Sequence, residues 1–531
     1  MLEWIKRRTE SQDLAIDDPA SAKAQLAELR GADALAALGE LSGWLESLKD
    51  AAGADNRSRS EILALIDEAG AAHEATLLAQ YLAGAAHGQG ERESNWKSLS
   101  DYQSGLTVAL YASARALIGS ADAGGSLPVL AAAAARCIRS CRVLAKICLV
   151  HYLDVPPKLW QAAYSLHAAA EKLGCATMTV SLRSATVTGV TQELLRFLML
   201  PMSAPEMMAP EQIEVTDRIL EQHGGDFTLR PRGATDGPFC FEPQSKLPPR
   251  RAAGREPAPN AEVRYFGPGL GFDALEQVFR RFAAAKIADI KTYGKDLAPH
   301  TQIAAVQHLL TFWRAKCPYS PPPHSRTTGE LRIIHRYSHL WQHLSRVRPA
   351  VTGLAIAQDD DAGAQAPETW TLHDAGGIEL GADLPQAAND WVQCGEVVGV
   401  SPHGSSEYWV GVILRMHAEP GRCQHADIAI LSRKPLAVSL RALVARGEAG
   451  VFTEASARQF AFSQVHAIIL SDGSEGSQKP NLLLPPDDWK EGRVYEATVG
   501  KSLRYLRGLH VVRRGGDYLR ATFEWIAAPQ D

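Results

Sequence analysis

The sequence contains few cysteines and no closely paired ones. Its eight cysteines are spread over 531 residues without a CxxC spacing, so a framework of disulfide bridges is not indicated. Cys137 and Cys141 stand one helical turn apart, which suits packing on one face of a helix. Because scattered cysteines are typical of a reducing compartment, we predict a cytoplasmic protein.

Long hydrophobic runs are also missing. No segment approaches the roughly 20 uninterrupted apolar residues that a membrane-spanning helix needs. The longest candidate, residues 127–153, is interrupted by Arg136, Arg139, Arg142 and Lys146, so we expect a buried helix of a soluble domain there. The N-terminal sequence MLEWIKRRTESQD carries charges where a signal peptide would have its apolar core. We therefore expect neither a signal peptide nor a membrane span.

The chain carries little net charge and no recognisable catalytic motif. Its net charge is −5, with 22% charged and 46% hydrophobic residues, which is the balance of a folded, soluble protein. Such a chain has no strong overall field to attract nucleic acid or an anionic membrane. A Gly-x-Ser-x-Gly nucleophile elbow is absent from the sequence. We therefore expect no nucleic-acid partner, no catalytic residues and no cofactor, and we predict that the protein is not an enzyme.

The first part of the chain has the pattern of α-helices. Its length alone suggests about two to four domains. Residues 1–223 are predicted to form an α-helical domain, because apolar residues such as Leu41 and Leu45 recur at three- and four-residue steps. Residues 224–262 are rich in Pro, Gly and Arg, which predicts a linker or an exposed loop. Residues 263–316 are predicted to form a smaller helical block.

The second part has the pattern of β-structure. The segment CPYSPPPHSRTTG separates the two parts, because consecutive prolines exclude a helix. Beyond it, short apolar or alternating runs such as GEVVGVS and EYWVGVILRM are separated by Gly, Pro, Ser and Asp, as in an antiparallel barrel or sandwich. We predict an antiparallel β-barrel over residues 325–445 and an additional β-rich element over 446–531.

One stretch of this β-rich part resembles a known family. The run WTLHDAGGIELGADLP, followed by WVQCGEVVGV and YWVGVILRM, resembles a divergent PilZ domain, with Gly377 at the position of the motif glycine. PilZ domains bind the bacterial second messenger cyclic di-GMP. The resemblance covers roughly residues 325–525 and is strongest within 368–440. It implies a β-barrel that acts in cyclic-di-GMP signalling, and through it in motility, adhesion or biofilm control.

The ligand-binding motif of that family is eroded here. Leu372 and Asp374 occupy the positions of its Asp/Asn and Ser, and leucine offers no hydrogen bond while a carboxylate repels phosphate. Arg332 and Arg336 have the spacing of the family's Arg-x-x-x-Arg arm, whose guanidinium groups suit guanine and phosphate. The same spacing also places two arginines on one solvent-facing side of a strand. The ligand-binding residues that the resemblance implies are Arg326, Arg332, Arg336, Asp374, Gly376 and Gly377.

Two functions fit these observations. The first is a cyclic-di-GMP-responsive signalling adaptor, whose barrel binds the ligand and whose helical region docks a protein partner. The alternative is a ligand-independent scaffold, in which a degenerate barrel is retained and the helical region docks its partner constitutively. Leu372 and Asp374 favour the scaffold, whereas Arg332 and Arg336 favour the adaptor.

Two further patterns resemble functional motifs. His335, His339 and His343 recur at four-residue steps, which suits zinc on a helix face, but no carboxylate or thiolate stands at a ligand-like step between them. We therefore predict no metal site there. The run VRYFGPGLGFDALEQVF has the strand, glycine loop and helix of a phosphate-binding turn, but it lacks the GxGxxG spacing. We interpret it as the start of a helix.

Overall fold

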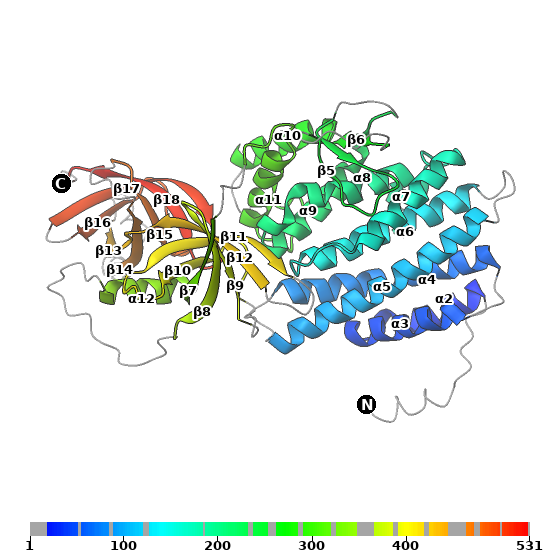
Figure 1. Cartoon of the computed structure of the whole chain (residues 1–531), viewed down its shortest axis with the longest axis horizontal. Coiled ribbons are helices and arrows are strands. Elements are labelled where there is room, and N and C mark those ends of the chain that lie inside the picture. Colours follow the sequence, from blue (N-terminus) through cyan, green and yellow to red (C-terminus); the bar gives the residue numbers. More distant parts are fainter. Residues whose placement is uncertain are drawn as a thin grey trace, which may run out of the picture. The chain divides into compact units, whose positions relative to one another are not determined.

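In the computed structural model of the chain, a mainly helical part precedes a mainly β-stranded part (Figure 1). The structure describes residues 18–50, 55–83, 89–119, 127–183, 186–231, 237–252, 262–284, 290–319, 325–347, 366–385, 391–418, 424–443, 464–471, 478–499 and 502–528. The chain divides into two compact units, Met1–Ser320 and Pro321–Asp531. The division falls inside the proline-rich segment that separates the two sequence patterns.

The first unit is built from helices that share one apolar core. Asp18 and Asp55 cap the helices that follow them by accepting hydrogen bonds from backbone amides. Leu275 and Leu309, from the block predicted over 263–316, are buried in the same core as Leu41. The helices are α2 (Pro19–Glu28), α3 (Ala34–Asp50), α4 (Asn56–Leu82), α5 (Gln89–Gly119), α6 (Leu127–Leu149), α7 (Pro157–Lys172), α8 (Val190–Met199), α9 (Pro210–His223), α10 (Leu270–Ala284) and α11 (Pro299–Phe312).

The cations that interrupt the long apolar run lie on α6 and are paired inside the protein. Lys146 Nζ lies 2.8 Å from Glu214 Oε2 and 2.8 Å from Asp217 Oδ2, and Arg142 pairs with Asp217. A buried charge is tolerated when it is paired in this way, since an isolated one is costly. Among the described residues, no helix is both long enough and apolar enough to cross a membrane.

The segment predicted as a linker or exposed loop, residues 224–262, differs from that expectation where the structure describes it. It contributes β3 (Thr228–Leu229), β4 (Phe239–Phe241) and β5 (Arg250–Arg251) to a sheet with β6 (Arg264–Gly267), in the order β3-β6-β4-β5. Phe239 and Phe241 are buried in the core of the helical unit. Their aromatic rings outweigh the loop-like composition around them, because burying them stabilises the segment against the helices. A separate two-stranded sheet pairs β1 (Val180–Leu182) with β2 (Thr186–Thr188).

The second unit contains two closed antiparallel barrels, which confirms the predicted fold class of a mainly α region followed by an antiparallel β-barrel. The first barrel has the order β10-β11-β12-β9-β8-β7, and the second has the order β13-β14-β15-β18-β17-β16. The first consists of β7 (Ser325–His335), β8 (Glu368–Ala375), β9 (Glu379–Asp383), β10 (Val397–Pro402), β11 (Trp409–Ala418) and β12 (Gln424–Ser432). The second consists of β13 (Leu436–Ala442), β14 (Gln464–Leu470), β15 (Asn481–Leu484), β16 (Val494–Val499), β17 (Ser502–Arg514) and β18 (Leu519–Ile526).

The division between the barrels lies earlier than the sequence pattern placed it. The strand β13 falls within the range 325–445 assigned to a single barrel, yet it pairs with β14 and β16 of the second barrel. An alternating apolar run predicts a strand but does not reveal its partner, because the partner lies far away in the sequence.

A short helix, α12 (Tyr337–Val347), packs between the barrels and was not predicted. Tyr337 Oη donates to the carbonyl of Leu483 at 3.1 Å, and Trp341 Nε1 donates to the carbonyl of Val438 at 3.2 Å. The Trp341 ring also stacks on His466, with ring centroids 3.7 Å apart. The helix shares one core with both barrels, made of Ile334, Tyr337, Leu340, Trp341, Leu344, Val397, Tyr408, Val410, Ala437, Ile468, Leu483 and Tyr518.

The ion pairs between α6 and α9 predict how stability depends on pH. Glu221 Oε1 lies 2.8 Å from Arg142 and 3.0 Å from Arg139. Burial opposes ionisation of Glu221, but these two arginines outweigh it and lower its pKa to about 2. A carboxyl whose pKa is lower in the folded state stabilises the fold above its unfolded pKa, which is about 4.3 for Glu.

We therefore expect Glu221→Gln to unfold at a lower temperature than the wild type near pH 7. The difference should shrink as the pH falls from about 5 towards 2, where the wild-type carboxyl becomes protonated. Calorimetric melting of the full chain across this range measures the effect. Glu61→Gln, at an exposed position on α4, is the matched control and should melt like the wild type throughout. A Glu221→Gln difference that stays constant with pH would contradict this assignment.

Candidate functional site

Four of the residues that the resemblance singled out lie together at one end of the first barrel. Arg326 on β7 lies opposite Asp374 on β8 in the strand register. β8 then turns into β9, and the turn is closed by a hydrogen bond of 2.8 Å from the Gly376 amide to the Glu379 carbonyl. Gly377 is exposed at the tip of this turn. The β8–β9 hairpin and the adjoining end of β7 therefore bring Arg326, Asp374 and the two glycines to one place.

A second arginine contacts the same hairpin and was missed in the sequence. Arg433, which directly follows β12, donates from Nη2 to the carbonyl of Gly377 at 2.9 Å. Its guanidinium carbon lies 4.8 Å from the centroid of the Trp409 ring. Arg433 is exposed, and a guanidinium has five donors, so this contact leaves donors for a ligand. A cation over an aromatic ring beside a glycine turn suits a flat, anionic ligand.

Arg332 lies at the other end of β7. Six residues of a strand span about 20 Å, so Arg332 stands well away from Arg326. Its Nη2 atom donates to Ser401 Oγ at 3.1 Å and to the carbonyl of Ser405. Its guanidinium carbon also lies 5.4 Å from the centroid of the Tyr408 ring. Arg332 thus holds the turn between β10 and β11 in place.

Arg336 stands where β7 ends and α12 begins. Its φ of 65° is in the left-handed region, and its carbonyl accepts a hydrogen bond of 3.1 Å from the Leu340 amide, inside α12. The Arg336 side chain is exposed, whereas that of Arg332 is partly buried. The predicted Arg-x-x-x-Arg pair therefore does not continue along one strand face. The structure brings Arg326, Asp374, Gly376 and Gly377 together, and it places Arg332 and Arg336 elsewhere.

The three histidines at four-residue steps do not converge. His335 is the last residue of β7, where its ring stacks on Trp391 with centroids 4.2 Å apart and its Nε2 lies 3.6 Å from Glu368. His339 and His343 are on α12, and the His343 ring meets Tyr408 edge-on. Because His335 belongs to the strand and the other two histidines belong to the helix, the regular spacing does not place all three on one helix face.

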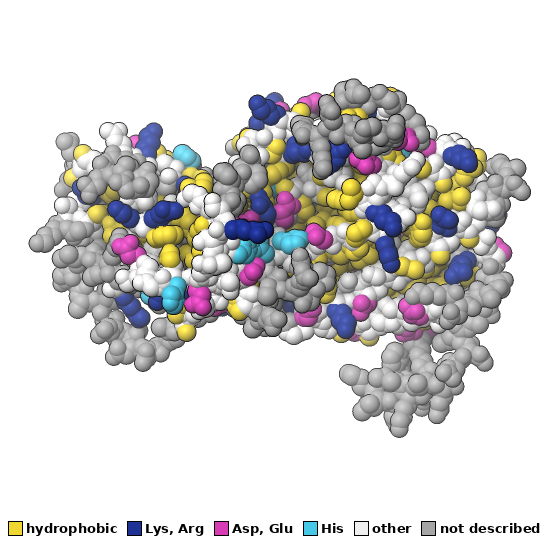
Figure 2. Space-filling view, in the orientation of Figure 1, with side chains coloured by type: hydrophobic (Ala, Val, Ile, Leu, Met, Phe, Trp, Pro, Cys, Tyr) yellow, Lys and Arg dark blue, Asp and Glu magenta, His cyan; other side chains and the backbone are white. Residues whose placement is uncertain are grey.

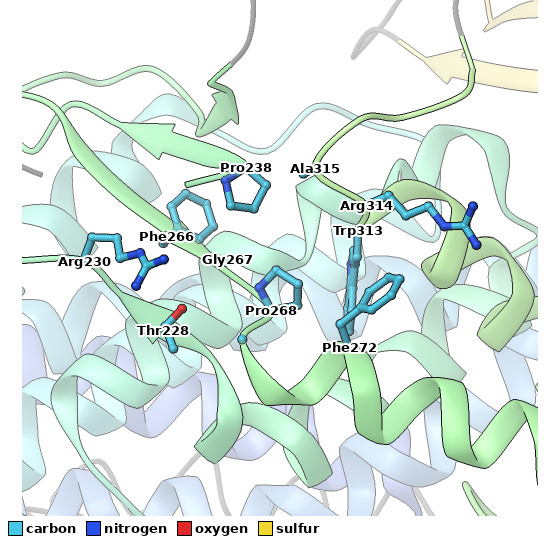
Figure 3. A pocket seen from close by; sticks show the side chains of 11 residues that line it. Thr228, Arg230, Pro238, Phe266, Gly267, Pro268, Phe272, Trp313, Arg314 and Ala315 are labelled. Carbon is cyan, nitrogen blue, oxygen red and sulfur yellow. The ribbon is translucent and has the colours of Figure 1, made fainter. Parts of the chain in front are cut away.

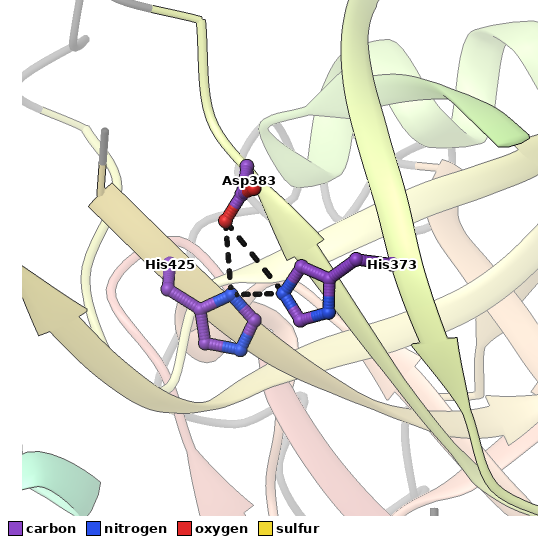
Figure 4. A group of neighbouring side chains, drawn as sticks. All are labelled: His373, Asp383 and His425. Atoms are coloured by element: carbon purple, nitrogen blue, oxygen red, sulfur yellow. Dashed lines mark hydrogen bonds and ion pairs between the residues drawn. The ribbon is translucent and has the colours of Figure 1, made fainter. Parts of the chain in front are cut away.

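A different group of histidines does converge. His373 on β8, Asp383 on β9 and His425 on β12 turn their side chains towards one point (Figure 4). His373 Nε2 lies 2.7 Å from His425 Nδ1 and 3.6 Å from Asp383 Oδ1, and His425 Nδ1 lies 3.3 Å from Asp383 Oδ1. Imidazole nitrogens and carboxylate oxygens are the donors that zinc and related transition metals bind. Sequence reasoning missed this group because its members come from three separate strands.

Each histidine of this group has a second carboxylate on its outer nitrogen. His425 Nε2 lies 3.1 Å from Asp427 Oδ1, and Asp427 is itself bound by Arg415 at 2.8 Å. His373 Nδ1 lies 3.3 Å from Asp374 Oδ2. Burial opposes protonation of His425, but the hydrogen bond with Asp427 and the nearby charges of Asp427 and Asp383 raise its pKa above the ordinary value. The carboxylates of Asp374, Asp383 and Asp427 therefore lie around the two imidazoles.

The helical unit holds a pocket of about 320 Å³ beside the glycine-rich loop (Figure 3). The loop joins β6 to α10, as the interpretation of a helix start predicted. The Gly271 and Phe272 amides donate to the carbonyls of Pro268 and Gly269, so these amides are used within the turn. Exposed Arg230 and Arg314 lie on opposite sides of the pocket in Figure 3. The pocket is lined by Thr228, Arg230, Pro238, Phe266, Gly267, Pro268, Gly269, Phe272, Trp313, Arg314 and Ala315.

Substitutions at the two ends of β7 are expected to differ in their effect on stability. Arg332→Ala removes the donor to Ser401 and to the Ser405 carbonyl, so it should destabilise the second unit by about 1–3 kcal/mol. Arg326→Ala changes an exposed side chain and should stay within about 0.5 kcal/mol of the wild type. Chemical unfolding of the full chain, followed by calorimetry of the same variants, measures both. Equal stability of the two variants would show that Arg332 does not hold the turn.

Comparison with known protein families finds a match within the helical unit. Residues 20–233 match the model of a protein family described as the cyclic-di-GMP receptor FimW, N-terminal domain. The matched range contains α2 to α9 and spans fewer than half of the 531 residues. No curated protein and no solved structure matches the chain. The helical unit is thus similar to the N-terminal domain of a receptor family.

Proposed function

We propose that this protein is a cytoplasmic, non-catalytic receptor for cyclic di-GMP that acts as a signalling adaptor in motility or biofilm control. The observation that carries the proposal is the match of residues 20–233 to the N-terminal domain of a cyclic-di-GMP receptor family. The β-barrel that follows this helical unit agrees with the PilZ-like arrangement that the sequence suggested independently. A helical domain followed by a ligand-binding barrel is the layout that a sensor with a separate docking domain requires.

The ligand site we propose is the β8–β9 hairpin end of the first barrel. Cyclic di-GMP offers two phosphates and two guanines, and guanidinium groups pair with both. Arg433 and Arg326 supply two such groups beside the turn of Gly376 and Gly377. Trp409 adds an aromatic face under Arg433. Exposed arginines and a close backbone approach at glycines are the features that a compact dinucleotide needs.

The charge of Asp374 acts against phosphate at this place, as the eroded motif indicates. Its Oδ2 lies 3.3 Å from His373 Nδ1, and its strand partner is Arg326. Arg326 reduces the repulsion, because a nearby cation offsets the carboxylate charge. We therefore propose that Arg433 and Arg326 provide contacts that the family's motif obtains from other residues.

The helical unit is proposed to dock a protein partner. Figure 2 shows hydrophobic side chains exposed between basic and acidic ones over this unit. Val108 on α5 is 57% exposed, although most apolar residues of that helix are buried. Ligand binding changes the affinity for such a partner only if cyclic di-GMP binds two arrangements of the protein with different affinity. Without that difference, the protein is the constitutive scaffold named above.

Calorimetric titration of the full chain with cyclic di-GMP tests the receptor. We expect saturable binding, and a roughly ten- to hundredfold loss of affinity in Arg326→Ala and in Arg433→Ala, because each charged contact is worth about 1–3 kcal/mol. Arg441→Ala, at an exposed arginine of the second barrel, is the matched control and should bind like the wild type. Unchanged affinity in the two barrel variants together with a loss in Arg230→Ala would move the site to the pocket of the helical unit. No saturable binding at all would favour the scaffold.

The eroded motif itself supplies a further prediction. Leu372→Asn combined with Asp374→Ser should strengthen binding, because the change adds hydrogen-bond donors and removes a carboxylate that repels phosphate. The same titration measures it. Binding by this variant but not by the wild type would show that the barrel retains the fold and has lost the ligand. Weaker binding than the wild type would contradict the proposed position of the ligand.

A further inference from the structure

The three inner atoms of the histidine group have the spacing of a tetrahedral metal site. Zinc binds imidazole nitrogen and carboxylate oxygen at about 2.0–2.1 Å, which places neighbouring donors of a tetrahedron about 3.3 Å apart. The three observed separations are 2.7, 3.3 and 3.6 Å, so they bracket that value. His425 is the strand partner of Asp383, and β9 pairs in turn with β8, which carries His373. The backbone ladder therefore brings the donors together.

The outer carboxylates determine which nitrogens face the centre as acceptors. A carboxylate only accepts hydrogen bonds, so Asp427 receives the N–H of His425 at Nε2, and the Asp374 carboxylate, 3.3 Å from His373 Nδ1, favours the N–H at that nitrogen. In neutral imidazoles, His373 Nε2 and His425 Nδ1 then carry lone pairs. These two lone pairs and the Asp383 carboxylate face one another, which is unfavourable without a cation between them. A proton satisfies one pair of these atoms, whereas a central divalent cation satisfies all three.

We propose that His373 Nε2, His425 Nδ1 and an Asp383 carboxylate oxygen bind one Zn²⁺ or a similar divalent transition metal ion. Carboxylates on the outer nitrogens of histidine ligands are the usual second layer of such sites, because they orient the ring and raise its basicity. Arg415 completes this layer by holding Asp427. The three ligand side chains are 26–43% exposed, so an ion can enter and solvent can supply a fourth ligand.

A metal at this point would join three neighbouring strands of the first barrel. It would link β12 to β8 and β9, the two strands of the hairpin that carries Gly376 and Gly377. The consequence is a hairpin whose stability depends on the ion, which is a property separate from cyclic-di-GMP binding. The inference rests on the geometry of the described side chains and does not require the proposed function to be correct.

Cobalt titration of the full chain, purified without a polyhistidine tag and treated with a chelator, tests the site. Tetrahedral Co²⁺ bound to nitrogen and oxygen gives visible absorption, and added Zn²⁺ should displace it. We expect one equivalent of bound Co²⁺ in the wild type and its loss in His425→Ala and His373→Ala. Asp427→Asn, which alters only the outer layer, should weaken Zn²⁺ binding about 10–100-fold. His403→Ala, at a histidine whose side chain is 74% exposed on the same barrel, is the matched control and should bind like the wild type.

Thermal melting with and without Zn²⁺ gives a second measurement. Zn²⁺ should raise the melting temperature of the wild type and of His403→Ala, because an ion that binds only the folded state stabilises it. Asp383→Asn serves where a histidine variant fails to fold, since this side chain is the most exposed of the three ligands, at 43%. Equal Co²⁺ and Zn²⁺ binding by the wild type, His425→Ala and Asp383→Asn would overturn the proposal and leave a proton between the two imidazoles. All these titrations contain no cyclic di-GMP, so their failure does not bear on the receptor.

Discussion

The short strand β9 determines which side chains meet on the first barrel. It hydrogen-bonds to β8 along one edge and to β12 along the other, so its register positions residues that are about 50 positions apart in the chain. Leu380 and Ala382 are buried, and this burial favours the observed register, because a shift by one residue would turn both side chains to the opposite face of the sheet. In this register, Asp383 meets His425, and the β8–β9 turn presents its glycines beside Arg433. The proposed ligand site and the proposed metal site thus depend on the same five-residue strand.

The second constraint in this unit is the helix between the barrels. Trp341 donates to a carbonyl of β13 and stacks on His466 of β14, while Leu340 packs against residues of β7 and β10 in the same core. Each barrel closes through its own hydrogen bonds, but neither buries all of its apolar surface alone. Because α12 fills the space between them, both barrels contribute to the core around this helix, while the second barrel has a separate core of its own. Arg336 begins this helix, which is why it is positioned by the junction and not by a strand face.

The helical unit contains buried charges that are paired with one another. Lys146 and Arg142 lie on α6, most of whose residues are buried, and their partners come from α9. The pairing removes the cost of burying isolated charges and fixes how the two helices are aligned. The pocket beside the β6–α10 loop is formed where this helical core meets the small sheet. The family match covers most of this unit. The evidence for the receptor family therefore comes from the helical unit, and the proposed ligand site lies in the other unit.

The sequence by itself determined the kinds of element and the order in which they follow one another. Periodic leucines predicted the helices, the prolines after Cys317 separated them from the strands, and alternating runs predicted an antiparallel barrel, because local spacing decides which face of an element is apolar. The resemblance to a known family also singled out Arg326, Asp374 and the glycine turn as ligand-binding residues, which stays a prediction. The sequence did not reveal that α12 follows β7, although Tyr337, Leu340, Trp341 and Leu344 have helical spacing, since the preceding strand pattern runs directly into them. Only the tertiary structure decided that β13 belongs to a second barrel, that Phe239 and Phe241 fold into the helical core, and that His373, Asp383 and His425 meet. These outcomes depend on pairing between strands and on burial against distant elements, which local sequence spacing does not encode.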